Sequence, residues 1–471
     1  MNKISEHFIN HIRQQLPSHL SLDDFLTIND KPLRFSVRVN TLKISIKDFK
    51  ELMSNKGWEL SPIPWCDEGF WVTTPSQQDI GNSIEHLQGL FYIQEASSML
   101  PPTALFDTKK EFDCVLDMAA APGSKTTQIA SLMENNGLLV ANEYSSSRVK
   151  MLHANLVRMG VYNTAITHFD AEVFGQYLFE SFDAILLDAP CGGEGTVRKD
   201  PNALKDWHLE DVHSIAEKQK QLILSAFEAL KVGGTLIYST CTLSREENQE
   251  VCLFLKETFD DAVEFVSLIN LFEGAEKATT SEGFLHIWPQ IYDSEGFFVA
   301  KIKKSKAVIR SKPEPRISKN FPFKELSPKQ EKDIRHWLVD NYSISIPSSL
   351  FLVIRDNQYW LFPKGIKPFI GKIRFQRIGL KIAEQKGKHL KITHEAISVL
   401  YRYQTGTIDL NEEQAAEYFK GRDIQLDNNS KPQGEKIVCT NKVALGLIKH
   451  LGTKLKNNLP RDLVRDNAVK L

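Results

Sequence analysis

The chain has 471 residues, of which 42% are hydrophobic and 25% are charged, and its net charge is −1. This length exceeds what one compact core holds, and the composition is that of a globular protein, which excludes a disordered or fibrous chain. No run of about 18 apolar residues is present, and the first residues lack the charged and then apolar segments of a signal peptide. We therefore expect a cytoplasmic protein with no membrane partner.

The two parts of the chain carry opposite charge. Residues 1–300 hold 24 Lys and Arg against 42 Asp and Glu, whereas residues 301–471 hold 34 against 17. A basic region joined to an acidic one predicts a polyanionic partner for the basic region. The alternative is that these charges only keep each domain soluble.

Residues 1–105 are predicted to form an α+β extension at the N-terminus. Residues 35–40 alternate between apolar and polar side chains, as in a strand. Residues 94–100 favour a helix, which we expect to end at Pro101 and Pro102.

Residues 106–304 alternate between predicted strands and helices. The strands are expected at 112–117, 138–143, 165–169, 182–188 and 234–239, and the helices at 124–133, 145–159 and 214–230. This alternation predicts an α/β fold with a Rossmann-like, doubly wound parallel sheet that binds ligands at the carboxyl ends of its strands. A later strand at 296–302 is predicted to lie antiparallel at one edge.

Residues 305–319 are rich in Lys, Pro and Ser and are predicted to be a linker. A small basic α/β domain is expected at 320–391, followed by a second small domain at 392–471. Between Lys364 and Lys391 there are nine Lys and Arg and one acid, with aromatic residues interleaved. Such a stretch suits contacts to RNA phosphates and stacking on bases.

The first central strand leads into the sequence Asp-Met-Ala-Ala-Ala-Pro-Gly-Ser-Lys-Thr at 117–126. Small residues and a glycine before a helix N-terminus let a ligand approach the backbone. The first glycine of a P-loop and the GxGxxG of dinucleotide enzymes are both missing, which argues against ATP and NAD.

Acidic residues follow the next strands. Glu143 comes 20 residues after Gly123, where a carboxylate accepts hydrogen bonds from a ribose, while Asp170 and Asp188 end the third and fourth strands. One such acid alone is more often a helix N-cap or a surface group. Together, and without a phosphate loop, the three favour a nucleoside cofactor, and S-adenosylmethionine fits best.

Two of the six cysteines stand at strand ends. Cys191 closes Asp-Ala-Pro-Cys at 188–191, and Cys241 lies in Ser-Thr-Cys-Thr at 239–242. A thiolate is a strong nucleophile, although a buried, inert cysteine is the commoner case. Position alone does not rank the two thiols. The six cysteines show no CxxC pair and no zinc-like spacing, so we expect free thiols and no metal site.

These motifs, together with Arg-Val-Asn-Thr-Leu at 38–42, resemble the RNA cytosine-C5 methyltransferases of the NOL1/NOP2/Sun group. The resemblance covers essentially the whole chain. It implies an enzyme that methylates C5 of a specific cytosine in the decoding region of 16S ribosomal RNA, within the small ribosomal subunit or its precursor, through a covalent bond between cysteine and cytosine C6. A tRNA cytosine-C5 methyltransferase and a non-catalytic, RNA-binding assembly factor are the alternatives.

The resemblance also implies roles for individual residues. Cys241 would be the nucleophile, Cys191 would help to release the product, and Asp188 would bond cytosine N3 or N4 as well as lie near the cofactor. The residues expected to contact S-adenosylmethionine are Ala119, Ala120, Ala121, Pro122, Gly123, Ser124, Lys125, Glu143, Asp170 and Asp188. Gly192 stands where the family more often has serine, and we expect this to alter local hydrogen bonding but not the reaction.

The flanking regions are expected to bind RNA. Residues 1–105 match the family-specific RNA-binding extension, and residues 392–471 resemble PUA-like RNA-binding domains through Lys-Asn-Asn-Leu-Pro-Arg at 456–461, although Leu447 stands where tryptophan is expected. Arg198, Lys199, Asp200 and Pro201 follow the Pro-Cys loop and either contact a flipped nucleotide and its phosphate or are solvated loop charges. Truncation near Lys303 is expected to leave cofactor binding largely intact and to weaken RNA binding.

Overall fold

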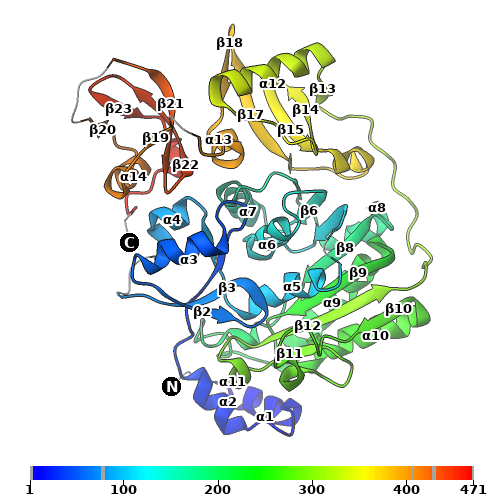
Figure 1. Ribbon diagram of the computed structural model, residues 1–471. Coiled ribbons are helices and arrows are strands. Elements are labelled where there is room, and N and C mark those ends of the chain that lie inside the picture. The colour runs from blue at the N-terminus through cyan, green and yellow to red at the C-terminus, as the bar shows by residue number, and fades with distance from the viewer. Residues whose placement is uncertain (1–3, 76–79, 110, 405–406, 427–430, 469–471) are drawn as a thin grey trace.

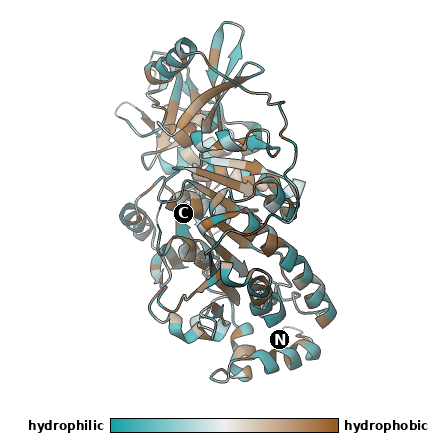
Figure 2. Cartoon of the chain, turned by 90° about the vertical axis from the view of Figure 1, so that its right-hand side faces the viewer, coloured by the Kyte–Doolittle hydropathy of each residue, from teal (hydrophilic) through white to brown (hydrophobic). Residues whose placement is uncertain are grey.

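The computed structural model describes residues 4–75, 80–109, 111–404, 407–426 and 431–468. Figure 1 shows a central α/β domain with the N-terminal elements along one side and two small C-terminal domains packed above it. In Figure 2, apolar residues follow the strands of the sheets, whereas hydrophilic residues gather on the outer faces of the helices. No helix within these described ranges is long and apolar enough to cross a membrane.

The N-terminal region begins with a helical pair, α1 (Glu6–Gln15) and α2 (Leu22–Asn29). A small antiparallel sheet follows in the order β2-β3-β1-β4. Its strands are β1 (Ser36–Val39), β2 (Glu59–Ile63), β3 (Cys66–Thr73) and β4 (Phe91–Ile93), and its helices are α3 (Ile46–Ser54) and α4 (Ile84–Leu87). The strand expected at 35–40 is therefore confirmed.

The helix expected at 94–100 is wrong. Residues Ser97–Met99 form a short 3-10 turn, and the helix α5 (Leu100–Phe106) begins where the prediction ends. Pro101 and Pro102 occupy its first turn, where the missing N–H has no intrahelical partner to lose and the fixed φ of proline suits the helix. The two prolines therefore start a helix instead of ending one.

The central sheet has the order β10-β12-β9-β8-β5-β6-β7-β16. Its parallel strands are β5 (Cys114–Asp117), β6 (Leu138–Asn142), β7 (Thr164–Thr167), β8 (Phe182–Asp188) and β9 (Leu230–Thr240). The strand order reverses at β5, so the predicted doubly wound sheet is confirmed. Its helices are α6 (Ser124–Leu132), α7 (Ser146–Met159), α8 (Phe174–Tyr177), α9 (Leu209–Ala229) and α10 (Gln249–Phe259).

Antiparallel strands complete one side of this sheet. β12 (Phe297–Lys304) pairs antiparallel with β9, as predicted, but it does not form the edge. β10 (Val263–Val266) pairs with its other side, and β11 (Leu285–Ile287) pairs with its first residues beside the short helix α11 (Pro289–Tyr292). Backbone groups on both sides of β12 are therefore paired, which the alternation of its side chains could not reveal.

The opposite edge of the central sheet is supplied from the C-terminal region. β16 (Arg377–Ile378) pairs antiparallel with β7, more than 200 residues earlier in the chain. The ring of Phe369 packs on that of Phe182 with centroids 5.5 Å apart. The basic stretch at 364–391 is thus partly built into the central domain.

The first C-terminal domain has a sheet in the order β13-β14-β15-β17-β18. Its elements are β13 (Lys324–Glu325), α12 (Pro328–Tyr342), β14 (Leu350–Arg355), β15 (Gln358–Pro363), β17 (Leu380–Lys386), β18 (His389–Ile392) and α13 (His394–Leu400). β18 crosses the boundary expected between 391 and 392, and α13 packs into a core that this domain shares with Ile437, Cys439, Ala444 and Leu447 of the last domain. We propose that the boundary lies after Leu400.

The last domain contains a second small sheet in the order β19-β21-β22-β23-β20. Its elements are β19 (Ile408–Asp409), α14 (Glu412–Phe419), β20 (Ile424–Gln425), β21 (Gly434–Thr440), β22 (Val443–His450) and β23 (Lys454–Asn457). Leu447 lies on β22 and is buried. Apolar side chains of this domain also pack against Ile84 of the N-terminal region, so the two ends of the chain meet.

Candidate active site

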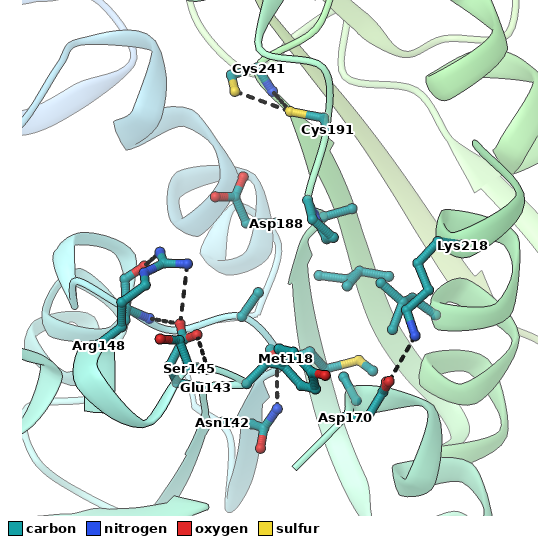
Figure 3. Close-up of a pocket in the computed structure, with 18 residues that line it drawn as sticks. Met118, Asn142, Glu143, Ser145, Arg148, Asp170, Asp188, Cys191, Lys218 and Cys241 are labelled. Carbon is teal, nitrogen blue, oxygen red and sulfur yellow. Dashed lines mark hydrogen bonds and ion pairs between the residues drawn. The ribbon is translucent and has the colours of Figure 1, made fainter. Parts of the chain in front are cut away.

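A cavity of about 510 Å³ lies at the carboxyl ends of the parallel strands. Residues that follow β5, β6, β7, β8 and β9 all contribute to its wall, at the point where the strand order reverses. Ligands of open α/β sheets bind at this position. Figure 3 shows the two cysteines at one end of the cavity and Asp170 at the other.

Two residues of the loop after β5 line the cavity. Ala119 and Ala121 line the cavity, whereas Ala120, Pro122, Gly123, Ser124 and Lys125 do not belong to its lining. Gly123 caps α6 with a φ of +107°, a left-handed conformation that favours glycine. This turn directs the chain into α6, and Ala119 and Ala121 before it line the cavity.

Glu143 is held at the end of β6 by backbone donors. Its Oε1 accepts from the N–H of Ser145 at 2.8 Å and its Oε2 from the N–H of Ala121 at 3.3 Å, and Arg148 lies 3.6 Å away. The residue is 3% exposed. A carboxylate fixed in this way can still accept hydrogen bonds on its remaining lone pairs.

Asp170 serves two purposes at the end of β7. It caps a short 3-10 helix by accepting from the N–H of Glu172 at 3.1 Å, and it pairs with Lys218 at 2.8 Å. Burial is the largest single effect and raises the pKa of the Asp170 carboxyl, but the hydrogen bonds from Lys218 and from the N–H of Glu172 and the charge of Lys218 together outweigh burial, so the pKa is lowered. Asp170 is therefore an N-cap as well as a wall of the cavity.

Asp188 is held by a lysine and a serine. Lys125 Nζ lies 2.7 Å from its Oδ2, and Ser239 Oγ donates to its Oδ1 at 2.7 Å. Burial is the largest single effect and lowers the pKa of Lys125, but the charge and the hydrogen bond of Asp188, with smaller contributions from neighbouring groups, together outweigh burial and raise the pKa. Lys125 therefore acts on the cavity through Asp188.

The two motif cysteines face each other. Cys191 Sγ lies 3.1 Å from Cys241 Sγ, and the N–H of Cys241 donates to Cys191 Sγ at 3.3 Å. The hydrogen bond with Cys241, together with burial, raises the pKa of Cys191 well above that of an ordinary thiol. Either thiol can donate its proton toward the other across this contact. All six cysteines lie in described segments and are free thiols.

Several lining residues were missed by the sequence analysis. Arg148 on α7 and Lys218 on α9 flank the acids, and further lining residues are Met118, Asn142, Tyr144, Ser145, Ala171, Leu187, Leu222, Ala189 and Pro190. Several of these directly follow a strand, a position that could have flagged them. Lys218 stands 48 residues from Asp170 on a long helix, and no spacing pointed to it.

Arg198 is not a solvated charge or a group exposed for RNA. Its side chain is 1% exposed, pairs with Asp293 at 2.7 Å and donates to the carbonyls of Lys31 and Pro32. It fastens the loop after Cys191 to the N-terminal region. Lys199 is exposed. Among the residues that the structure describes, no group of three or more potential metal ligands comes together.

Four family models match consecutive parts of the chain. Residues 104–303 match the 16S rRNA methyltransferase RsmB/F model, and residues 4–96 match the N-terminal domain of 16S rRNA methyltransferase RsmF. Residues 323–400 match the pre-PUA domain of ribosomal RNA small subunit methyltransferase F, and residues 405–465 match the RsmF PUA domain. The predicted PUA-like character of the last domain is confirmed.

Relatives and solved structures agree with these models. A protein from Shewanella oneidensis named ribosomal RNA small subunit methyltransferase F is 60% identical, over 100% of this chain and 99% of its own length. A relative of the same name from Shewanella sp. strain MR-7 is 59% identical over the same shares. A methyltransferase homologue from Pyrococcus horikoshii is 35% identical with a TM-score of 0.53, covering 64% of this chain and all of that one. NSun6 from the same organism, at 22% identity and a TM-score of 0.55, covers 65% of this chain and all of its own and shares the fold.

Proposed function

The chain belongs to the RsmB/F family of 16S rRNA methyltransferases, and we propose that it methylates C5 of a cytosine in the decoding region of 16S rRNA. The proposed methyl donor is S-adenosylmethionine, and the proposed site of action is the small ribosomal subunit or its precursor in the cytoplasm. The observation that carries the proposal is the contact between two thiols, beside an ion-paired aspartate, at one end of the cavity.

The residues around the cavity fit S-adenosylmethionine. Its carboxylates, at Glu143, Asp170 and Asp188, suit a ligand with ribose hydroxyls, an amino group and a positive sulfonium. Apolar lining from Met118 and Leu222 suits an adenine ring. When bound, the cofactor supplies a methyl group on sulfonium, which is an electrophile.

Cytosine C5 is a poor nucleophile, and a cysteine changes that. We propose that the thiolate of Cys241 adds to C6, which makes C5 electron-rich, and that C5 then bonds the methyl carbon while the bond from that carbon to the donor sulfur breaks and its electron pair stays on the sulfur. A base then takes the C5 proton, the bond between C6 and Sγ breaks, and its electron pair returns to Cys241. Asp188 would accept a hydrogen bond from the cytosine amino group, with Lys125 holding the Asp188 side chain in place.

The roles of the two cysteines are unequal in this proposal. The raised pKa of Cys191 disfavours its thiolate, which supports Cys241 as the attacking group. The 3.1 Å contact supports a role for the Cys191 proton in the departure of Cys241 from the product. A base-paired cytosine must first be extruded, at about a few kcal/mol, to reach these thiols.

The experiment is bisulfite sequencing of all RNA from cells with and without the gene. We expect one 5-methylcytosine in 16S rRNA to disappear with the gene. Loss from tRNA instead would favour the tRNA enzyme, and unchanged 5-methylcytosine everywhere would refute the proposal in favour of an assembly factor.

A second experiment separates the cysteines. Cys241→Ala should abolish the covalent RNA–protein adduct, whereas Cys191→Ala should let the adduct accumulate. Cys252→Ala is the matched control, because Cys252 is fully buried on α10 away from the cavity. The reverse pattern would exchange the two roles.

A further inference from the structure

Two buried carboxylates lie behind the cysteine loops and have no part in the reaction proposed above. Glu194 follows Cys191 by three residues and Glu247 follows Cys241 by six, each within a short 3-10 turn. They are 1% and 0% exposed. Buried carboxylates are costly unless they are hydrogen-bonded, so their partners show what they do.

Glu194 belongs to the Cys191 loop but binds the Cys241 loop. Its Oε2 accepts from the N–H of Leu243 at 3.0 Å and its Oε1 from the indole N–H of Trp207 at 2.6 Å. The hydroxyls of Thr242 and Ser244 reach it at 2.8 Å and 2.7 Å. Because a short N–H bond ends on each oxygen, both oxygens of Glu194 act as acceptors and neither is placed to donate a proton.

Glu247 makes the reciprocal connection. Its Oε2 accepts from the N–H of Gly192 at 3.0 Å and from the amide of Gln219 at 2.8 Å. The same Gln219 amide donates to the carbonyl of Pro190 at 2.8 Å. Glu247, which follows Cys241, therefore holds the residues on either side of Cys191.

The proton count at Thr242 distinguishes the two carboxyls. Its Oγ1 lies 2.8 Å from Glu194 Oε2 and 3.1 Å from Glu247 Oε1, yet a hydroxyl has one proton to donate. The shorter N–H bonds to Glu247, from Gly192 and Gln219, both end on Oε2, whereas Oε1 has only a 3.4 Å contact from the N–H of Gly192 and faces Thr242. A proton on Glu247 Oε1 satisfies both contacts, with Thr242 donating to Glu194.

We propose that Glu194 and Glu247 are positioning residues that hold the two cysteine loops together through Thr242, with Glu194 ionised and Glu247 protonated. The expected effect on the rate of methyl transfer rests on the proposed function, but the hydrogen bonds that join the two cysteine loops are present in the protein without substrate. Burial and the charge of Glu194 raise the pKa of Glu247 to about 7, in agreement with the proton count. The other titratable groups near Glu247 are Cys191 and Tyr238.

The test compares charged, neutral and truncated side chains at both positions in the full-length protein. Glu194→Ala and Glu247→Ala should each lower kcat by about 100-fold, the cost of small misplacements of reacting groups, with little change in KM. Glu247→Gln should restore most of kcat, because an amide copies a protonated carboxyl. Glu194→Gln should not restore kcat, because the side-chain NH₂ would face the N–H of Leu243 or the indole N–H of Trp207. As pH rises through about 7, the ratio of kcat for Glu247→Gln to kcat for wild type should increase.

A second readout does not depend on methyl transfer. The readout is the ratio of the rates at which iodoacetamide alkylates Cys191 and Cys241, followed by mass spectrometry. This ratio should change in Glu194→Gln and stay close to the wild-type ratio in Glu247→Gln. Thr242→Ser keeps the hydroxyl and should behave like wild type. Thr242→Val should show the same change in relative alkylation rate that is expected for Glu194→Gln, so it tests the proposal if Glu194→Gln does not fold.

Each outcome decides the proposal. Equal loss in Glu194→Gln and Glu247→Gln would overturn the proton assignment, and wild-type thiol reactivity and rates in all variants would overturn the positioning role. If the wild-type protein methylates no RNA but the variants still change the relative alkylation rates of Cys191 and Cys241, the proposed function is refuted and the positioning role of Glu194 and Glu247 is supported.

Discussion

Removal of every residue after Lys304 is expected to disrupt the central sheet. β16 forms the edge next to β7: the N–H of Gln376 donates to the carbonyl of Ile166 at 2.8 Å, and the N–H of Gly379 donates to that of Thr164 at 2.9 Å. β7 leads directly to Asp170 in the cavity wall. The expectation from sequence, that this truncation spares cofactor binding, does not fit this arrangement.

The size of the effect follows from the apolar side chains that the deleted segment adds to the central core. Six buried ones belong to that core cluster: Val353, Phe362, Ile366, Phe369, Ile373 and Ile378. At about 1.5–3 kcal/mol for each fully buried large side chain, they contribute roughly 9–18 kcal/mol, an upper limit because unfolded chains already bury some surface. This is as large as the whole free energy of unfolding of a typical domain, about 5–15 kcal/mol.

The assay compares fragments 1–304 and 1–400 with the full chain. Thermal unfolding followed by circular dichroism should be cooperative for the full chain and for 1–400, which keeps all six side chains, but not for 1–304. Calorimetry should show S-adenosylhomocysteine binding to the first two proteins. Within the full chain, Phe369→Ala should lower the free energy of unfolding by about 3–5 kcal/mol, whereas Ile309→Ala at a 91% exposed linker position should have no effect. Cooperative unfolding of 1–304 with full-length cofactor affinity would refute this reasoning.

Three further predictions concern single features. Burial raises the pKa of Asp117 to about 7, so the folded state binds a proton more tightly than the unfolded state, and stability should fall as pH rises from about 4 to about 7. Asp117→Asn should remove this pH-dependent loss of unfolding free energy, roughly 4 kcal/mol, as measured by urea titration. If the variant shows the same pH dependence as wild type, the raised pKa of Asp117 is not its cause. Arg198→Ala should destabilise the fold by about 1–3 kcal/mol without a matching loss of RNA affinity, whereas the neighbouring control Lys199→Ala should leave the melting temperature unchanged. Combined replacement of the exposed Lys386, Lys388 and Lys391 by alanine should weaken RNA binding and lower the salt slope by about one unit per lost phosphate contact; equal slopes would exclude contacts there.

The sequence predicted those parts of the fold that are set by local patterns. The buried strands from Cys114 to Asp188 are apolar runs bounded by turns and helices, and each was found within a few residues of its expected place. The acids at their ends line one cavity because parallel strands end at the same edge of a sheet. The predictions that failed concerned strands whose place depends on distant partners. β16 is a two-residue strand with no periodicity of its own, and the residues of β12 alone do not show that β10 pairs with its other side.

The two cysteines show the same limit at the level of chemistry. As motifs they are interchangeable, because each follows a strand of one sheet, and their difference arises from groups that no spacing reveals. Gly192, the departure from the family pattern, is an example: a Cβ there would lie 3.0 Å from Glu247 Oε1, the atom that faces Thr242. Glycine lets that carboxyl approach the loop closely enough to accept the N–H of residue 192. A serine would need Glu247 to shift, or would offer its own hydroxyl to the carboxyl, so this position bears on how the Cys191 loop is held as well as on local hydrogen bonding.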